Sequence, residues 1–343
     1  MYQFNSDYLE GADPQVLAAL TATNSEQTPG YGEDAHCANA RKMILDWAEC
    51  PDGAVHFLVG GTQANLTVIS AALRPWEGVI SAVTGHINVH ETGAIEATGH
   101  KVLALPEKDG KLTAAQVADF VRTHREDATH EHMVKPAMVY ISHPTEQGTL
   151  YSRDELCALS AVCRELGLWF FVDGARLGYG LAADPQVDMP LLANLADAFT
   201  IGGTKAGLLF GEAVVLPGEK LQSEFRYAMK QRGGMLAKGR LLGVQFEALL
   251  ADRYYVKRCA QANAMAQLLK NAFLQKGIPL LCDTFANQIF PILTQKQIDW
   301  LQNDYIFAHW QSVGEGRSAV RFCASVTTEA RGVAALLEDI AKL

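Results

Sequence analysis

The chain has 343 residues, of which 49% are apolar and 20% are charged, so it can form one large domain and a smaller one with an ordinary globular composition. Its 38 acidic side chains outnumber the 29 basic ones, for a formal net charge of −9, and no basic cluster indicates a nucleic-acid or membrane partner. No apolar run approaches bilayer length, the N-terminus lacks a secretory signal pattern, and the seven cysteines form no CxxC pair, which predicts a cytoplasmic protein with reduced thiols.

The first half of the chain alternates between strand and helix patterns. Residues 1–33 are rich in turn formers and are expected to form an arm over the remainder, before an amphipathic helix at 34–49. We then expect strands at 54–59, 79–84, 101–105, 137–142 and 168–172, and helices at 62–73, after residue 90, and at 113–125 and 152–166. This alternation predicts an α/β fold with a large, mainly parallel sheet and helices on both faces, where ligands bind beyond the carboxyl ends of the strands.

The pattern changes beyond residue 207. We expect a strand at 208–216, two long helical stretches between 218 and 276, short strands at 278–281, 288–293 and 320–323, and helices at 295–303 and 328–341. The sequence therefore predicts a large domain over residues 1–251 and a smaller C-terminal α+β domain over residues 252–343.

A glycine-rich segment, Gly60-Gly61-Thr62-Gln63-Ala64-Asn65, follows the first of the alternating strands and opens a helix. Small residues let backbone amides approach an anion, Thr62 can cap the helix, and the helix dipole favours negative charge. The segment suits a phosphate, although it has neither the lysine of a Walker loop nor the glycine spacing of a dinucleotide fingerprint. A glycine turn followed by an N-cap explains the same residues without a ligand.

Two charged residues stand at the ends of later apolar strands. Asp173 ends the run at 168–172, where a carboxylate is costly to bury unless it meets a cation such as a protonated pyridine nitrogen. An ion pair with Arg176 or a helix cap is the alternative. Lys205 lies among small residues, where partial desolvation would lower its pKa and make it a nucleophile toward carbonyls, unless the segment is a plain turn.

These three features together form the set that pyridoxal phosphate requires: a phosphate-binding helix start, an aspartate at a strand end, and a lysine on the same side of the sheet. At this point the chain resembles the threonine aldolase and β-eliminating lyase group of fold-type-I pyridoxal-phosphate enzymes over nearly its whole length. The matching motifs are Asn5-Ser6-Asp7, Tyr31-Gly32-Glu33-Asp34, the Gly60 to Asn65 segment, Gly85-His86, Asp173-Gly174-Ala175-Arg176, Thr204-Lys205 and the segment around Arg321.

The resemblance implies a role for each matching residue. Lys205 would form a Schiff base with the cofactor, Asp173 would keep the pyridine nitrogen protonated, and His86 would stack on the ring. A guanidinium fork matches a carboxylate at two points, so arginine suits the substrate carboxylate. The implied cofactor-binding residues are Gly61, Thr62, His86, Asp173, Arg176 and Lys205, and the implied substrate-binding residues are Ser6, Tyr31, Arg176 and Arg321.

The resemblance also implies a homodimer or homotetramer with active sites at the subunit interface. Tyr31 stands where related enzymes bring a loop to the neighbour's active site. The run from Lys230 to Gly234 resembles the segment that supplies a cation to the partner's phosphate, and Lys230, Arg232 and Lys238 are all candidates.

One position departs from the better-known aldolases of this group. They carry a histidine shortly before the glycine of an Asn-Thr-His-Asn-Gly run, whereas this chain has His143-Pro144-Thr145-Glu146-Gln147-Gly148, with Glu146 at the histidine's position. Glu146, His86, His143 and a phosphate-held water are therefore all possible bases for the substrate hydroxyl. A carboxylate with a raised pKa can act as a base at neutral pH.

Other charged clusters are better explained without a ligand, and we expect no metal site. His86, His90 and Glu91 have the spacing of a partial zinc site, but no second cluster completes it. The stretch that contains His124, His130, Glu131 and His132 has the composition of a solvated loop. Arg317 is expected at the surface, next to Gly316.

The resemblance implies a pyridoxal-phosphate-dependent carbon–carbon lyase, with Lys205, His86, Glu146 and Asp173 as its catalytic residues. It would cleave a β-hydroxy-α-amino acid such as threonine or allo-threonine to glycine and an aldehyde. One alternative keeps the cofactor but eliminates a substituent from Cβ, and a remote one is a nucleotide-binding α/β protein without catalysis.

Overall fold

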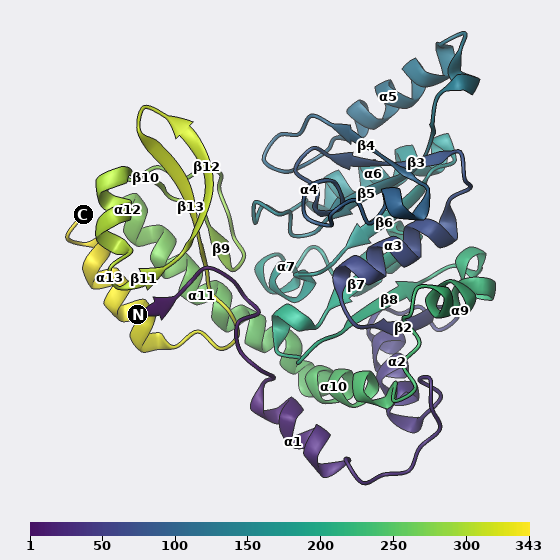
Figure 1. Ribbon diagram of the computed structural model, residues 1–343, viewed down its shortest axis with the longest axis horizontal. Helices are drawn as coiled ribbons and strands as arrows, with labels where there is room; N and C mark the ends of the chain where they lie inside the picture. Colours follow the sequence, from purple (N-terminus) through teal and green to yellow (C-terminus); the bar gives the residue numbers. More distant parts are fainter.

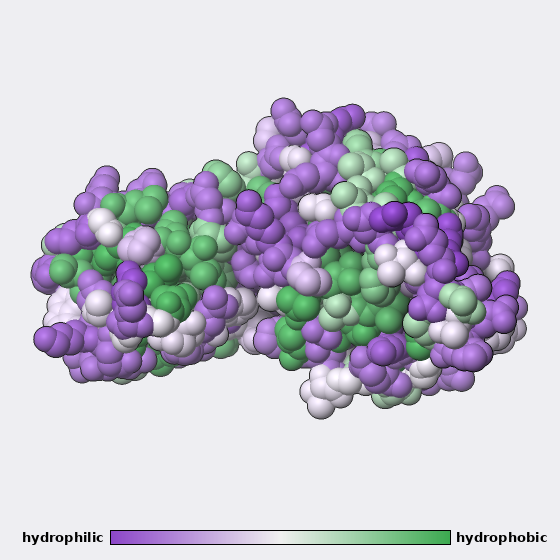
Figure 2. All heavy atoms as spheres, turned by 90° about the horizontal axis from the view of Figure 1, so that it is seen from above, coloured by the Kyte–Doolittle hydropathy of each residue, from purple (hydrophilic) through white to green (hydrophobic).

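The computed structural model describes residues 1–343 as two lobes that one long helix, α11 (Tyr254–Gln275), connects (Figure 1). The large lobe contains a seven-stranded sheet, and both chain termini lie in the small lobe (Figure 1). Hydrophilic side chains gather where the two lobes meet (Figure 2). No helix has the length and apolar character needed to cross a membrane.

The large sheet has the strand order β2-β8-β7-β6-β5-β3-β4. All neighbouring strands in it are parallel except that β8 runs antiparallel to both β2 and β7. The strands are β2 (Ala54–Leu58), β3 (Glu77–Ala82), β4 (Lys101–Leu105), β5 (Lys135–Ser142), β6 (Trp169–Asp173), β7 (Ala198–Gly202) and β8 (Glu212–Leu216). The predicted mainly parallel sheet is thus confirmed.

Helices cover both faces of this sheet. One face packs against α3 and α9 in one hydrophobic cluster, and the other belongs to a larger cluster that continues into the small lobe. The helices are α2 (Ala35–Trp47), α3 (Gly61–Ala72), α4 (His86–Val89), α5 (Ala114–Glu126), α6 (Arg153–Leu166), α7 (Leu177–Ala183), α8 (Met189–Leu195), α9 (Gln222–Gln231) and α10 (Arg240–Leu250), with 3₁₀ turns at Glu96–Thr98, His130–His132, Thr204–Ala206, Glu219–Leu221 and Ala251–Arg253.

The small lobe combines C-terminal strands and helices with the first residues of the chain. Strand β13 is central, because β10, β12 and β9 all pair with it, and β1 forms a separate parallel pair with β11. The elements are β1 (Tyr2–Gln3), β9 (Gln288–Ile289), β10 (Ile292–Thr294), β11 (Tyr305–Ile306), β12 (Ala308–Gly314), β13 (Arg317–Cys323), α12 (Gln295–Leu301) and α13 (Ala330–Ile340). The division into domains at residue 251 stays a prediction; it falls in the 3₁₀ turn before α11.

The N-terminal arm therefore spans both lobes. After β1 the chain passes into α1 (Pro14–Ala22), which packs against α10 of the large lobe. Its N-cap is Asp13, whose carboxylate accepts a hydrogen bond of 3.0 Å from the backbone N–H of Gln15. The same carboxylate accepts a hydrogen bond from Arg258 on α11. The arm is thus held by ionic and backbone contacts as well as by apolar packing.

Several expected elements differ from the structure. We expected a helix after His90. The structure instead has a short helix, α4, before His90 and a 3₁₀ turn after it. The strand expected from residue 208 begins only at Glu212, because the preceding residues form a turn in which Gly207 and Gly211 have positive φ angles. The two helical stretches expected between 218 and 276 are three helices, since the chain turns at Gly233 with a positive φ angle and again at 251–253.

Candidate active site

A cavity of about 300 Å³ opens at the edge of the large sheet where the parallel strands end. Its wall includes the start of α3, the loop after β5, the end of β6, and Lys205 in the turn after β7. A second cavity of about 530 Å³ adjoins it toward the small lobe and shares Tyr8, His86, Glu146, Arg176 and Lys205 with it. Ligands in open α/β sheets bind at this edge, so these two cavities form the candidate active site.

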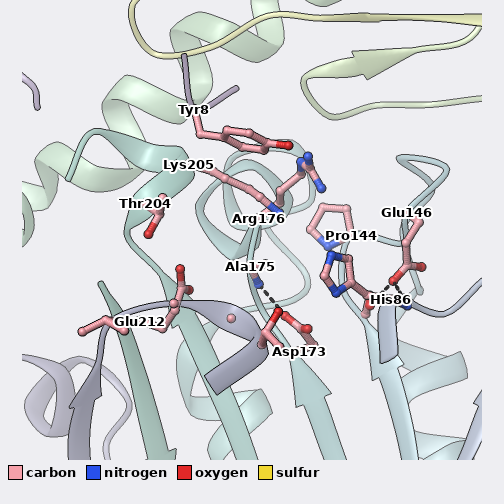
Figure 3. Close-up of a pocket in the computed structure, with 15 residues that line it drawn as sticks. Tyr8, His86, Pro144, Glu146, Asp173, Ala175, Arg176, Thr204, Lys205 and Glu212 are labelled. Atoms are coloured by element: carbon pink, nitrogen blue, oxygen red, sulfur yellow. Dashed lines mark hydrogen bonds between the residues drawn. The ribbon is translucent and has the colours of Figure 1, made fainter. Parts of the chain in front are cut away.

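Asp173 is the last residue of β6 and lies at the floor of the first cavity (Figure 3). Its Oδ2 accepts hydrogen bonds from the Tyr140 hydroxyl at 2.6 Å and the Asn65 amide at 2.9 Å, and its Oδ1 accepts one from the backbone N–H of Ala175 at 2.8 Å. All three donors are neutral. A buried carboxylate without a protein cation suits a ligand that brings a positive charge.

Lys205 extends into the cavity above Asp173 (Figure 3). Burial lowers the pKa of Lys205, and the nearby Arg176 guanidinium lowers it further. Both causes favour the neutral amine, which is the form that attacks a carbonyl carbon. The predicted pairing of Lys205 and Asp173 around one cavity is therefore present in the structure.

Arg176 is already paired with Asp7, the residue that follows the predicted substrate-binding Ser6. Its Nε and Nη2 atoms donate to the two carboxylate oxygens of Asp7 at 2.7 and 3.0 Å. Burial alone would raise the pKa of Asp7, but Arg176 and Lys205 outweigh it and hold that pKa well below its usual range. Asp7 therefore neutralises much of the Arg176 charge, and only part of the guanidinium is left for a substrate.

Arg321 is the less compensated arginine of the second cavity. Its Nη2 donates to the backbone oxygen of Asn5 at 2.7 Å, its guanidinium lies 5.5 Å from the centre of the Trp310 ring, and it forms no ion pair. Ser6 is buried, its hydroxyl has no hydrogen-bond partner, and it lines neither cavity. Of the two predicted carboxylate-binding arginines, Arg321 thus carries the more available charge.

Glu146 lines both cavities, whereas His143 lines neither. The Oε1 atom of Glu146 accepts hydrogen bonds from the backbone N–H of His86 at 2.8 Å and from the Ser142 hydroxyl. Burial raises the pKa of Glu146 despite the hydrogen bond from Ser142. His143 is fully buried, neither of its ring nitrogens has a partner, and burial lowers its pKa to about 4. Among the bases that the sequence left open, Glu146 is better placed than His143.

The start of α3 provides an open position for an anion. A methyl group added at Gly60 or Gly61 would meet no other atom within 4 Å, so the backbone there faces free space. Both glycines and Thr62 line the first cavity. Exposed N–H groups at the positive end of a helix suit a phosphate, so the residues present fit pyridoxal phosphate at both its ring nitrogen and its phosphate.

Tyr31 and the three basic candidates for the partner's phosphate lie outside both cavities. Tyr31 has a positive φ angle, is 47% exposed, and lies beneath the ammonium group of Lys230, which is 4.8 Å from the ring centre. Lys230 and Lys238 are also exposed. In a single chain these residues contribute nothing to the cavity around Lys205.

Glu212 is a cavity residue that the sequence interpretation missed. It is the first residue of β8, pairs with Gly202 of β7, and lies opposite His86 in the cavity (Figure 3). It is 4% exposed, and its Oε2 has no hydrogen-bond partner. Burial raises the pKa of Glu212 to about 8, although Lys205 opposes the rise. Because β8 is antiparallel, its first residue lies at the edge where the parallel strands end.

This buried acid makes stability depend on pH. The folded chain holds the Glu212 proton up to about pH 8, whereas in the unfolded chain this carboxyl group loses its proton near its ordinary pKa of 4.5. Its stabilising contribution is therefore complete below pH 4.5 and is lost as the pH rises toward 8. Relative to Glu212→Gln, the wild-type chain is expected to lose about 1.4 kcal/mol of unfolding free energy per pH unit across this window.

Urea unfolding of both chains at several pH values between 5 and 8 measures this slope. Glu219→Gln, which changes an exposed acid a few residues further along, is the matched control and is expected to follow the wild type. Parallel curves for wild type and Glu212→Gln would show that Glu212 is ionised throughout the window.

Comparison with known proteins supports the predicted resemblance. The chain matches the beta-eliminating lyase family over residues 3–295. It is 34% identical to a low specificity L-threonine aldolase from a Pseudomonas species, over 98% of this chain and 96% of that protein. The structure of a threonine aldolase from Leishmania major is 43% identical, has a TM-score of 0.97, and aligns over 100% of this chain and 99% of that chain.

More distant structures share only the fold. Aspartate aminotransferase from Thermus thermophilus is 14% identical, with a TM-score of 0.70 over 100% of this chain and 91% of that chain. The structural matches confirm the predicted fold-type-I architecture. The family match and the Pseudomonas relative confirm the predicted class of enzyme, a lyase. The chain belongs to the beta-eliminating lyase family.

Proposed function

We propose that the chain is a pyridoxal-phosphate-dependent aldolase that cleaves a β-hydroxy-α-amino acid, of the threonine or allo-threonine type, to glycine and an aldehyde. The observation that carries this proposal is that Lys205 and Glu146 line the same two cavities, the second of which also contains Arg321. The similarity to threonine aldolases from Pseudomonas and Leishmania major supports it. A nucleophilic amine, a base and a carboxylate-binding cation are what this cleavage needs.

Each group has a separate task in this proposal. Pyridoxal phosphate, when bound, supplies an electron-withdrawing ring that stabilises the negative charge left at Cα. Lys205, with its neutral amine, would hold the cofactor at its carbonyl group, and Asp173 would hold it at the ring nitrogen. Glu146, in its ionised form, accepts the proton of the substrate's β-hydroxyl group as the bond between Cα and Cβ breaks.

The substrate carboxylate would bind in the second cavity. The predicted set of Ser6, Arg176 and Arg321 includes one residue, Arg321, that has no acidic partner and extends into this cavity. Arg176 would support it with the part of its guanidinium that Asp7 leaves free. Holding the carboxylate there would orient the Cα bonds of the substrate, and that orientation would select the bond that breaks.

Replacing Arg321 with alanine is expected to raise KM for the amino acid by about 10- to 100-fold, because a charge-assisted contact worth roughly 1.5–3 kcal/mol is lost. Affinity for pyridoxal phosphate should stay within about threefold. Steady-state kinetics and cofactor titration measure the two effects. Arg317→Ala removes an arginine of the same strand that lines neither cavity, and it is the matched control. If Arg321→Ala instead lost its affinity for pyridoxal phosphate, the assignment of Arg321 to the carboxylate site would be refuted.

We also propose that the working form is a cytoplasmic homodimer or homotetramer in which Tyr31 and one of Lys230, Arg232 and Lys238 serve the neighbouring active site. The exposure of Tyr31 and its distance from the cavities of its own chain support this. The seven free thiols are in keeping with a reducing compartment. Sedimentation of the purified chain would test the oligomeric state. Mixing inactive Lys205→Ala chains with inactive Tyr31→Ala chains would test whether the subunits share an active site.

The function is tested most directly by product analysis. Incubation of the purified chain and pyridoxal phosphate with L-threonine or L-allo-threonine is expected to release glycine and acetaldehyde, and glycine added alone should alter the visible spectrum of the bound cofactor. Pyruvate or another keto acid with ammonia would indicate β-elimination, the alternative chemistry. A chain that binds no pyridoxal phosphate and shows neither reaction would leave only the nucleotide-binding alternative.

A further inference from the structure

A continuous chain of hydrogen bonds runs behind the cavity wall. The Nδ1 atom of His86 lies 2.8 Å from Oε1 of Glu91, and the Asn65 amide donates to that same oxygen at 2.8 Å. The Asn65 nitrogen also donates to Oδ2 of Asp173 at 2.9 Å. His86, which begins α4, and Asp173, which ends β6, both line the cavity and are thereby connected through two residues that do not line it.

Glu91 is an unusual residue to find in this position. Its side chain is 0% exposed, and its Oε2 has no hydrogen-bond partner. A buried carboxylate is costly unless a cation meets it, and the one cationic group in contact with Glu91 is the imidazole of His86 when that ring is protonated. The sequence left Glu91 as part of an incomplete metal pattern, whereas the structure gives it His86 as a partner.

Asn65 brings the buried carboxylates of Glu91 and Asp173 close together. Its one amide nitrogen bonds to two buried carboxylates, so both of its N–H groups are used, and the two acidic oxygens are held within reach of a single atom. The two carboxylates lie so close together that each favours a donor group on its other side. The Nδ1 atom of His86 contacts one of them. The ring nitrogen of pyridoxal phosphate, under the proposed function on which this inference rests, would contact the other.

We propose that Glu91 and Asn65 are positioning residues that hold His86 and Asp173 in one hydrogen-bonded chain, so that the stacking imidazole and the ring-nitrogen carboxylate are fixed together before the cofactor binds. Glu91 fixes the plane of the His86 ring through its Nδ1 atom, and Asn65 fixes the distance between Glu91 and Asp173. Neither residue touches the cofactor or the substrate, so both act through the residues that they hold.

The test is a double-mutant cycle on cofactor affinity, with Glu91→Gln, His86→Phe and the double variant of the full chain. Glutamine keeps the shape of Glu91 and one acceptor oxygen but removes its charge, and phenylalanine keeps a ring for stacking but removes the nitrogen that Glu91 binds. Glu91→Gln alone is expected to weaken pyridoxal phosphate binding by about tenfold, the effect of one charge-assisted hydrogen bond. In the His86→Phe background it should change affinity by less than about twofold, because the His86 nitrogen is already gone and the glutamine oxygen can still accept the hydrogen bond from Asn65.

Quenching of tryptophan fluorescence by added pyridoxal phosphate measures each affinity without any need for turnover. An equal loss in both backgrounds would show that Glu91 supports the fold in general and would overturn the proposal, as would an unchanged affinity in Glu91→Gln. Glu96→Gln, an exposed acid close by, should bind as wild type does.

The same measurements separate this proposal from the proposed function. A wild-type chain that binds pyridoxal phosphate but produces keto acid instead of glycine and aldehyde would refute the aldolase and leave the positioning role in place. A wild-type chain that does not bind the cofactor would overturn both. Aldolase activity in the wild-type chain, together with coupling between the Glu91 and His86 substitutions in their effect on cofactor affinity, would support both proposals.

Discussion

Replacing Lys205 with alanine is expected to lower kcat by a factor of about 10⁴ to 10⁶, the range found when the nucleophile of a covalent mechanism is removed. The loss would be almost complete because no other amine lines either cavity. The fold should persist. Burial lowers the pKa of Lys205, which means that a charged amine at this position does not stabilise the folded chain, so its removal should cost little stability. Coupled aldehyde release measures turnover, and thermal unfolding measures the fold.

Lys205→Arg is the sharper companion to the alanine variant. Arginine keeps the positive charge but cannot attack a carbonyl, so this variant should be as inactive as Lys205→Ala. Lys296→Ala, which removes an exposed lysine on α12, should retain full activity. Substantial turnover by either Lys205 variant, after correction for wild-type contamination, would refute the assignment of Lys205 as the nucleophile.

Replacing Glu146 with glutamine should lower kcat by about 10²- to 10⁴-fold and leave KM within a few-fold, because a positioned general base acts mainly in the transition state. Burial raises the pKa of Glu146, and the ionised form is the active base. Wild-type kcat/KM should therefore rise with pH through a limb that lies above the usual carboxyl range. The glutamine variant should lack this limb.

Glu131→Gln, an exposed acid in the loop after α5, is the control for Glu146→Gln and should show the wild-type profile. If Glu146→Gln kept both the rate and the acidic limb, the base would be another group, and His86 would be the next residue to test. His143 would not, because its ring is buried behind the cavity and bonds to nothing through either nitrogen.

The fold and the core of the candidate site could be predicted because they depend on local signals. Alternating strand and helix patterns predicted the parallel sheet. Asp173 ends one of its strands and Lys205 lies in the turn after the next, so the parallel order brings both to one edge. The segment predicted to bind a phosphate was identified in the same way, from small residues at a helix start. Each of these needs only the sequence of one segment and the direction of one strand.

Glu212, Glu91 and Asn65 could not be assigned because their roles depend on which segments meet. Glu212 reaches the cavity only because β8 runs antiparallel to its neighbours, and a strand's direction is not written in its own residues. Asn65 meets Glu91 and Asp173 across 26 and 108 residues of chain. The ion pair of Arg176 with Asp7 likewise spans 169 residues, so the sequence predicted Arg176 as a site residue without showing that Asp7 neutralises it.

The path of the first residues has a practical consequence. Tyr2 and Gln3 pair with β11, the backbone oxygen of Asn5 accepts a hydrogen bond from Arg321, and Asp7 forms an ion pair with Arg176. A few consecutive residues thus connect the small lobe to the wall of the active site. Removing this segment would leave the Arg176 charge without Asp7 and Arg321 without its backbone hydrogen bond. An affinity tag for purification is therefore better fused to the C-terminus than to Met1, and trimming of the N-terminus by a protease should be checked by mass spectrometry before any kinetic result is interpreted.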